Sequence, residues 1–264
     1  MLEVKQIVKT FFKGTVNEKV ALHEVDLRLE SGDFATVIGG NGAGKSTLLN
    51  SIAGVFPVDS GTIHINDTDI TKMPEYKRAA FIGRVFQDPM LGTAGNMQIE
   101  ENLLLALRRG KRMGLKWAFV PKERELFRER LSLLGLGLED RLTARMGLLS
   151  GGQRQSITLL MATMLRPELL LLDEHTAALD PKTAENVLNL TDKLVQEHNL
   201  TTLMITHNMR DALRFGNRLI MMNNGRIIFD VRGEEKKKLT VQDLLERFEV
   251  AGDTVSDRMV LGAK

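Results

Sequence analysis

The chain has 264 residues, of which 43% are hydrophobic and 27% charged, and this balance excludes a disordered, collagen-like or fibrous protein. A formal net charge of +2 is too small to indicate nucleic acid as a partner, and the absence of cysteine excludes disulfides and cysteine-based metal sites. The apolar runs are far shorter than the roughly 20 residues that cross a bilayer, and the first residues do not resemble a signal peptide, so we expect a folded protein that stays inside the cell.

Strand-like stretches dominate the first part of the chain. Residues 25–29 alternate apolar and charged side chains, which is typical of a strand with one buried face. Residues 34–38 form a short apolar run that ends in glycine, as a buried strand does before a turn. Further strands are predicted at residues 4–8, 61–65 and 80–86.

Helical periodicity replaces the strand pattern between residues 99 and 164, where leucines recur at helical spacing among arginines and glutamates. We expect this segment to be a helical insertion. Buried-strand patterns return at residues 169–172 and 202–205, with a helical stretch at 184–198 between them. This order predicts a β-α-β unit, so the core resumes after the insertion.

The last part of the chain is predicted to form a hairpin, joined by an Asn-Gly turn between residues 218–222 and 226–231, and then a short helix at 241–248. Two basic clusters, at residues 108–112 and 236–238, are interpreted as solvated helix ends. An apolar stretch follows the first cluster, so contact with a membrane surface or an anionic partner is the alternative there. Its apolar residues are Met113, Leu115, Trp117 and Phe119.

A glycine-rich stretch follows the predicted strand 34–38 and matches the phosphate-binding pattern G-x-x-x-x-G-K-[ST]. In this P-loop (residues 39–47), glycines let backbone N–H groups converge on phosphate oxygens, and the following helix adds its positive N-terminal end. Lys45 is expected to reach the outer phosphates, and Ser46 to ligate Mg²⁺. The predicted nucleotide-binding residues of this loop are Gly39, Asn41, Gly42, Ala43, Gly44, Lys45, Ser46 and Thr47.

Two carboxylates, Asp173 and Glu174, follow the apolar run 169–172, at the carboxyl end of a strand where α/β sheets bind ligands. We expect Asp173 to lie among the ATP-binding residues and to hold Mg²⁺ through a water molecule. Glu174 is predicted to orient or deprotonate the water that attacks the γ-phosphate. A strand that ends in Asp-Glu is often only an exposed turn, but the P-loop favours the catalytic interpretation.

The pentapeptide Leu-Ser-Gly-Gly-Gln at residues 149–153, the signature segment, leads into a helical stretch at 154–165. Its serine can cap that helix, which gives a second anion-binding helix end besides the P-loop. This pentapeptide resembles the signature of the ABC ATPase family. In that family Ser150, Gly151, Gly152 and Gln153 would contact the ATP held by a partner subunit.

The resemblance covers nearly the whole chain and implies an α/β fold, with a P-loop NTPase core, an N-terminal antiparallel β region and an inserted α-helical subdomain. One ABC ATPase domain would span residues 1–264. It would comprise a RecA-like/β core at 1–98 and 166–235, a helical signature subdomain at 99–165 and a C-terminal helical tail at 236–264.

The resemblance also assigns single residues. Gln87 matches the Q-loop glutamine, which senses Mg²⁺ and the γ-phosphate, and His207 the switch histidine, which contacts the γ-phosphate. Asp180 matches the D-loop, which meets the opposite subunit. Phe11 is the candidate for stacking on adenine, with the adjacent Phe12 left open as the alternative. At position 175 a histidine, with no catalytic role assigned, replaces the proline most common in the family.

The family's mechanism implies ATP and Mg²⁺ as cofactors and a second copy of the chain as partner, because a single copy cannot easily bring both helix ends to one nucleotide. ATP hydrolysis would then drive a separate transmembrane permease, docked at residues 88–102, with the chain peripheral on the cytoplasmic face of the membrane. The resemblance favours uptake of amino acids or similar small solutes, with a solute-binding protein outside the cell and no nucleic acid.

Three alternatives remain for this function. An export or lipoprotein-release system is the runner-up, suggested by residues 11–22. A non-transport ABC ATPase of DNA repair or translation is more distant, because the chain holds one cassette and no long coiled coil. A P-loop kinase or GTPase is more distant still, since neither needs the signature segment.

Overall fold

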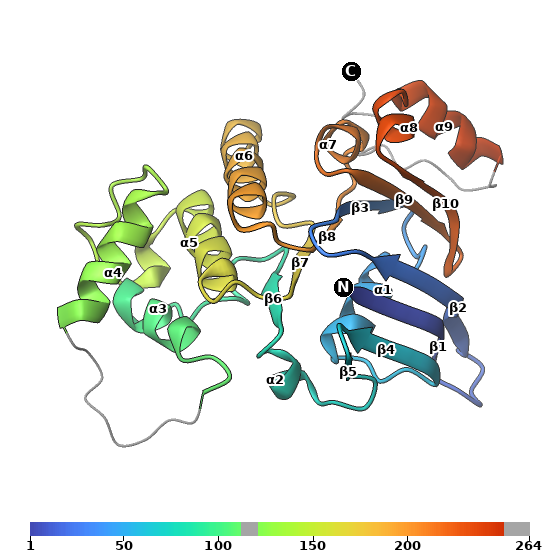
Figure 1. Cartoon of the computed structure of the whole chain (residues 1–264), viewed down its shortest axis with the longest axis horizontal. Coiled ribbons are helices and arrows are strands. Elements are labelled where there is room, and N and C mark those ends of the chain that lie inside the picture. The colour runs from blue at the N-terminus through green and yellow to red at the C-terminus, as the bar shows by residue number, and fades with distance from the viewer. Residues whose placement is uncertain (112–120, 251–264) are drawn as a thin grey trace.

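The computed structural model describes residues 1–111 and 121–250, and it has the α/β architecture expected from the sequence. A four-stranded antiparallel sheet has the order β2-β1-β4-β5, and a six-stranded sheet has the order β10-β9-β3-β8-β7-β6 (Figure 1). The strands are β1 (Leu2–Phe11), β2 (Lys19–Leu29), β3 (Phe34–Gly39), β4 (Ser60–Ile65), β5 (Thr68–Asp69), β6 (Ile82–Val85), β7 (Leu169–Asp173), β8 (Thr202–Ile205), β9 (Arg218–Asn223) and β10 (Arg226–Arg232).

In the six-stranded sheet the strands from β9 to β6 run parallel, and β10 adds an antiparallel edge. The carboxyl ends of β3, β7 and β8 therefore lie at one edge, which is where α/β sheets bind ligands. The expected hairpin is β9 and β10, with positive φ at Asn224 and Gly225 (46° and 73°). These special angles are what an Asn-Gly turn supplies without strain.

Helices cover both faces of this sheet. On one face, α1 (Lys45–Ala53) buries Leu48, Leu49 and Ile52 in a single cluster with residues of both sheets. On the other face, α5 (Gly151–Thr163) and α6 (Pro181–His198) pack leucines against β7 and β8. Because strands between two such layers have no solvated side, β3 is buried along its whole length, as its apolar run predicted.

The helical insertion consists of α3 (Ile99–Leu107), α4 (Pro121–Ser132) and α5, which share their own apolar cluster at one end of the molecule (Figure 1). The helix predicted at 154–165 begins earlier, at Gly151, and ends at Thr163. The cap formed by Ser150 and the packing of both glycines against neighbouring elements outweigh the low helix propensity of glycine. The apolar stretch at 113–119 lies outside the described residues.

The C-terminal helices are α7 (Met209–Arg214), α8 (Glu234–Lys237) and α9 (Val241–Val250). Residues of α7 and α9 pack with β9 and β10 in a fourth apolar cluster. The interpretation of cluster 236–238 as a solvated helix end is wrong for Lys236, which is buried and donates to the carbonyls of Phe215 and Gly216. The short helix α2 (Glu75–Arg78), α7, α8 and β5 were not predicted.

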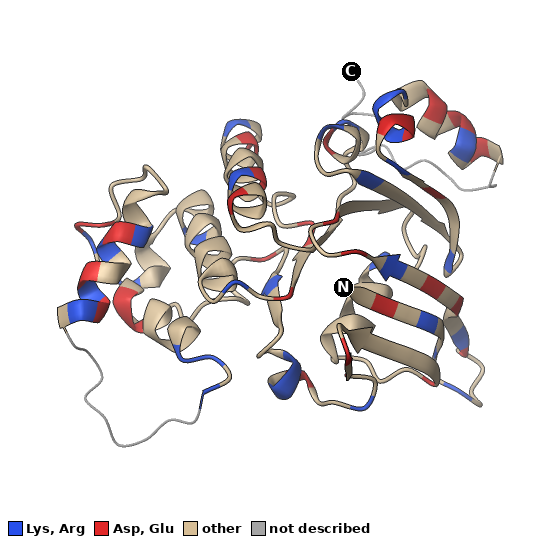
Figure 2. Ribbon diagram, viewed as in Figure 1, with Lys and Arg blue, Asp and Glu red and all other residues tan. Residues whose placement is uncertain are grey.

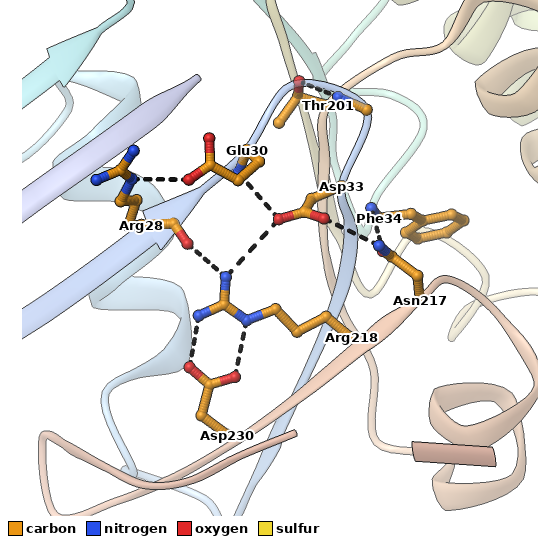
Figure 3. A network of polar contacts seen from close by, with 9 residues as sticks. Arg28, Glu30, Asp33, Phe34, Thr201, Asn217, Arg218 and Asp230 are labelled. Carbon is orange, nitrogen blue, oxygen red and sulfur yellow. Dashed lines mark hydrogen bonds and ion pairs between the residues drawn. The ribbon is translucent and has the colours of Figure 1, made fainter. Parts of the chain in front are cut away.

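A polar network fixes the start of β3 against β9 (Figure 3). Buried Arg218 donates to Asp230 at 2.7 Å, lies 3.8 Å from Asp33 and donates to the Arg28 carbonyl of β2. Asn217 donates to Asp33 at 2.9 Å. The network therefore ties the first sheet to the strand that leads into the P-loop.

Acidic and basic residues are interspersed along α4, α6 and α9 (Figure 2), in keeping with the small net charge. Across residues 1–111 and 121–250, no helix has the length and apolar character needed to span a membrane.

Candidate functional site

A pocket of about 230 Å³ opens at the carboxyl edge of the six-stranded sheet, beside the P-loop. It joins segments far apart in the sequence: the end of β1, the start of β2, the P-loop and the turns after β7 and β8. Its lining residues are Phe11, Lys19, Ala21, Asn41, Gly42, Ala43, Gly44, Lys45, Ser46, Thr47, Glu174 and His207.

The P-loop takes a shape that only glycine allows at two positions. Gly42 and Gly44 have φ of 82° and 98°, and a Cβ at Gly44 would lie 2.7 Å from the Ala21 carbonyl oxygen. Gly44 is also the N-cap of α1 and, as a glycine, brings no capping side chain to the first N–H groups of the helix. This arrangement suits a phosphate acceptor.

Lys45 is nearly buried, with 6% of its surface exposed, and its ammonium lies folded back against the loop. It donates to the carbonyls of Gly39 and Gly40 at 2.7 and 3.0 Å. Gly39 itself ends β3 and does not line the pocket. The lysine therefore holds its positive charge at the floor of the pocket.

Glu174 turns away from the end of β7 with a φ of 47°, an angle that is strained for a residue with a side chain. The turn brings it into the pocket, where its Oε1 lies 2.5 Å from His207 Nε2. His207 follows the end of β8, the strand next to β7. Two residues predicted from separate motifs are thus in direct contact.

Asp173, the last residue of β7, is half-buried next to this pair. Burial raises the pKa of its carboxyl, and the Arg84 guanidinium at 3.8 Å opposes that rise. Asp173 does not line the pocket but is close enough for the charges of Lys45 and His207 to act on it.

Gln87, the third predicted metal ligand, is exposed in the loop after β6 and does not line the pocket. Of the two aromatic candidates, Phe11 lines the pocket and packs edge-on against Phe56 at 5.1 Å. Phe12 is 70% exposed and is not among the lining residues.

The signature segment lies outside the pocket. Ser150 caps α5: its hydroxyl accepts from the Gln153 backbone N–H at 3.3 Å, and the Gln153 side chain accepts from the Ser150 N–H at 3.2 Å. The glycines Gly151 and Gly152 form the first turn. Asp180 caps α6 and accepts from the Thr183 N–H at 3.1 Å.

Sequence reasoning missed three residues around the site. Lys19 lines the pocket from β2, and Arg84 donates to Asn50 of α1 at 2.7 Å while facing Asp173. Gln155, on α5, donates to the carbonyls of Phe86, just after β6, and of His175, just after β7. None of the three belongs to a pattern with a fixed spacing, so no local signal marked them.

Known proteins resemble this chain in sequence and in fold. The family model described as ABC transporter matches residues 22–177. A tyrosine transport ATP-binding protein of Clostridioides difficile is 47% identical over 251 residues, which cover 95% of this chain and 100% of that protein. A methionine import ATP-binding protein of Enterococcus faecalis is 34% identical, over 94% of this chain and 70% of that protein.

Among solved structures, the dimeric post-hydrolysis state of an ATP-binding cassette bound to ADP and Pi matches with a TM-score of 0.75. The sequence identity is 29%, over 88% of this chain and 98% of that one.

Proposed function

The chain belongs to the ABC transporter family as an ATP-binding cassette that hydrolyses ATP, and on that premise we propose that two copies close around two ATP molecules and drive a membrane permease. The observation that carries the proposal is the pocket in which the P-loop, Glu174 and His207 meet. A phosphate chain needs the converging donors that the P-loop offers, and hydrolysis needs a base beside it.

Binding of ATP would use the P-loop for its phosphates and an aromatic ring for its base. The backbone N–H groups of residues 41–47 and the ammonium of Lys45 would hold the phosphates. Phe11, at the end of β1, would stack on adenine, which its place in the pocket supports over that of Phe12. Lys19 offers a second cation at the same pocket.

Hydrolysis would begin at Glu174. Its carboxylate would orient the attacking water and accept its proton, while the water oxygen bonds to the γ-phosphorus and the bond to ADP breaks. His207 would hold the γ-phosphate. Because the two side chains contact each other at 2.5 Å, binding of ATP would separate them: His207 would donate to the γ-phosphate, and Glu174 would accept from the attacking water.

Mg²⁺ fits the residues present. A hydroxyl from Ser46 and a carboxylate from Asp173, acting through water, are hard oxygen donors of the kind Mg²⁺ prefers. Among the described residues there is no cluster of three acidic or histidine side chains able to hold a metal alone. The ion would therefore need further oxygen ligands, from the phosphates of ATP and from Gln87. When bound, it would offset the negative charge of the phosphates.

A second copy would complete each site. The N-terminal end of α5 carries Ser150, Gly151, Gly152 and Gln153 outside the chain's own pocket. In a two-fold dimer this end would meet the ATP held by the partner, and Asp180 would lie at the same interface. The dimeric cassette that this chain resembles supports such an arrangement.

The division of the chain follows the same proposal. The core at residues 1–98 and 166–235 would bind ATP, the helical subdomain at 99–165 would present the signature segment, and residues 236–264 would form the tail.

Residues 88–102 would dock the permease. Met90 and Leu91 in that stretch are 51% and 70% exposed, which suits a contact with another protein.

We infer that the transported solute is an amino acid, with tyrosine as the first candidate, taken up through a permease and a solute-binding protein outside the membrane. The two relatives named above, for tyrosine and methionine, support this choice. The chain would lie on the cytoplasmic face of the membrane, held there by the permease.

The test is transport itself. The chain, reconstituted in vesicles with the permease and binding protein encoded beside it, should move tyrosine towards the ATP-containing side. The same vesicles with Lys45→Ala should not. Movement in the opposite direction would replace import with export, and a failure of any permease to co-purify with the chain would contradict the transport role.

A further inference from the structure

Gln155 lies in the second turn of α5, two residues after the signature segment, and its side chain is completely buried. Its amide nitrogen donates to the Phe86 carbonyl at 3.0 Å and to the His175 carbonyl at 2.6 Å. One side chain of the signature helix thus reaches the main chain beyond two different strands, β6 and β7.

The two hydrogen bonds fix which way the amide faces. A glutamine nitrogen carries two N–H donors, and both are used here. Turning the amide around would set its oxygen against two carbonyl oxygens, which only accept. Across residues 1–111 and 121–250, the oxygen Oε1 has no hydrogen-bond partner although it is buried. An unpaired buried acceptor is destabilising, so filling space does not explain a glutamine at this position.

Both acceptors adjoin residues with proposed catalytic roles. Phe86 comes directly before Gln87, and His175 directly after Glu174. The strands that carry them are neighbours in register, with Val85 opposite Leu172. The amide therefore bridges the points at which the chain leaves the sheet for the Q-loop and for the catalytic turn.

The two acceptor residues are themselves held in place. The Arg84 guanidinium stacks over the Phe86 ring at 4.4 Å. The His175 ring is buried, and its Nε2 lies 3.0 Å from the hydroxyl of Thr191 on α6. A shift of Gln155 would thus act on two well-packed segments instead of being absorbed by loose ones.

We propose that Gln155 is a positioning residue that ties the signature helix to Gln87 and Glu174 of its own subunit. The proposal rests on the function proposed above, in which the N-terminal end of α5 meets the partner's ATP. When that end contacts the partner's ATP, movement of α5 would be transmitted through Gln155 to Glu174, the base that hydrolyses the subunit's own ATP. The two sites of a dimer would be coupled by this side chain.

The test compares Gln155→Met with Thr163→Val. Methionine has a similar volume but no donor, so it removes both hydrogen bonds with little change in packing. Thr163 is a matched control, because it is buried on the same helix and, within the described part of the chain, its hydroxyl bonds only to the Leu159 and Leu160 carbonyls of that helix. Gln155→Glu is a second variant, since a buried carboxyl offers at most one donor.

Two measurements on the full-length chain are needed. In ATP hydrolysis, Gln155→Met should lower kcat by about 10- to 100-fold, because a base misplaced by about 1 Å loses that much rate, while the KM for ATP stays within about threefold. In hydrogen exchange without nucleotide, segments 86–90 and 174–179 should exchange faster than in the wild type. Thr163→Val should change neither, and circular dichroism should show all variants folded.

The proposal is overturned if Gln155→Met and Gln155→Glu match Thr163→Val in kcat and in exchange of both segments. Glu174→Gln, measured in parallel, separates this failure from failure of the catalytic assignment. If that variant hydrolyses ATP normally, Glu174 is not the base, and the exchange data alone then decide whether Gln155 holds the two segments.

Discussion

Gly152→Ala tests how closely the signature helix packs on its neighbour. Gly152 is the second residue of α5, and an added Cβ would lie well under 3.0 Å from Thr183 Cγ2 of α6, a separation that Cβ atoms essentially never show. Alanine would gain up to about 1 kcal/mol in helix propensity. Overpacking costs about 1–3 kcal/mol, and the depth of this overlap favours the upper part of that range. We expect a net loss of about 1–2 kcal/mol in the free energy of unfolding.

Urea unfolding of two companion variants makes this prediction specific. Gly151→Ala is the control, because among the described residues its Cβ would meet only Leu179 Cδ2, at an ordinary 3.4 Å. In Gly152→Ala/Thr183→Ser the clashing methyl is gone and the next atom, Thr183 Cβ, lies at 3.5 Å, so stability should return to that of Gly151→Ala. A Gly152→Ala protein as stable as Gly151→Ala would refute the reasoning.

Three further changes have defined outcomes. Burial lowers the pKa of His175 from 6.5 to about 4, so the unfolded chain binds the proton first and the fold loses stability as pH falls from 6.5 towards 4. Urea titrations should show the free energy of unfolding falling by about 2 kcal/mol from pH 7 to pH 5, and His175→Asn should lack this loss. Phe11→Ala should weaken binding of a fluorescent ATP analogue by about 5- to 100-fold, as loss of one stacked base does, whereas an equal effect of Phe12→Ala would contradict the choice between them. Arg84→Gln removes the cation facing Asp173, so half-maximal hydrolysis should need less Mg²⁺, and an unchanged requirement would show that Arg84 does not act on the metal site.

The parts of the fold that were predicted correctly are those specified by neighbouring residues. The apolar run before the P-loop, the Asn-Gly hairpin and the β-α-β unit around α6 are all local patterns, and each is present. The start of α5 was predicted three residues late, because two glycines disfavour a helix in isolation. The cap at Ser150 is local and was expected from the sequence, but the close approach of Thr183 is a tertiary feature that helix propensity does not contain.

The candidate site divides in the same way. Lys45, Glu174 and His207 could be found because each closes a motif, and the structure brings them to one pocket. Arg84 and Gln155 could not be found, because their importance depends on β6 lying beside β7 and on α5 packing against β6, from where Gln155 reaches the chain beyond both strands. Such contacts join residues far apart in the sequence, so no regular residue spacing predicts them.

The central claim is that Glu174 is the base of an ATPase that works as a pair. The most direct measurement is the mass of Glu174→Gln in solution with ATP and Mg²⁺, together with its rate of hydrolysis. We predict a dimer that retains uncleaved ATP, with turnover reduced by at least about 100-fold relative to the wild type. A monomer that hydrolyses ATP at the wild-type rate would contradict both parts of the claim.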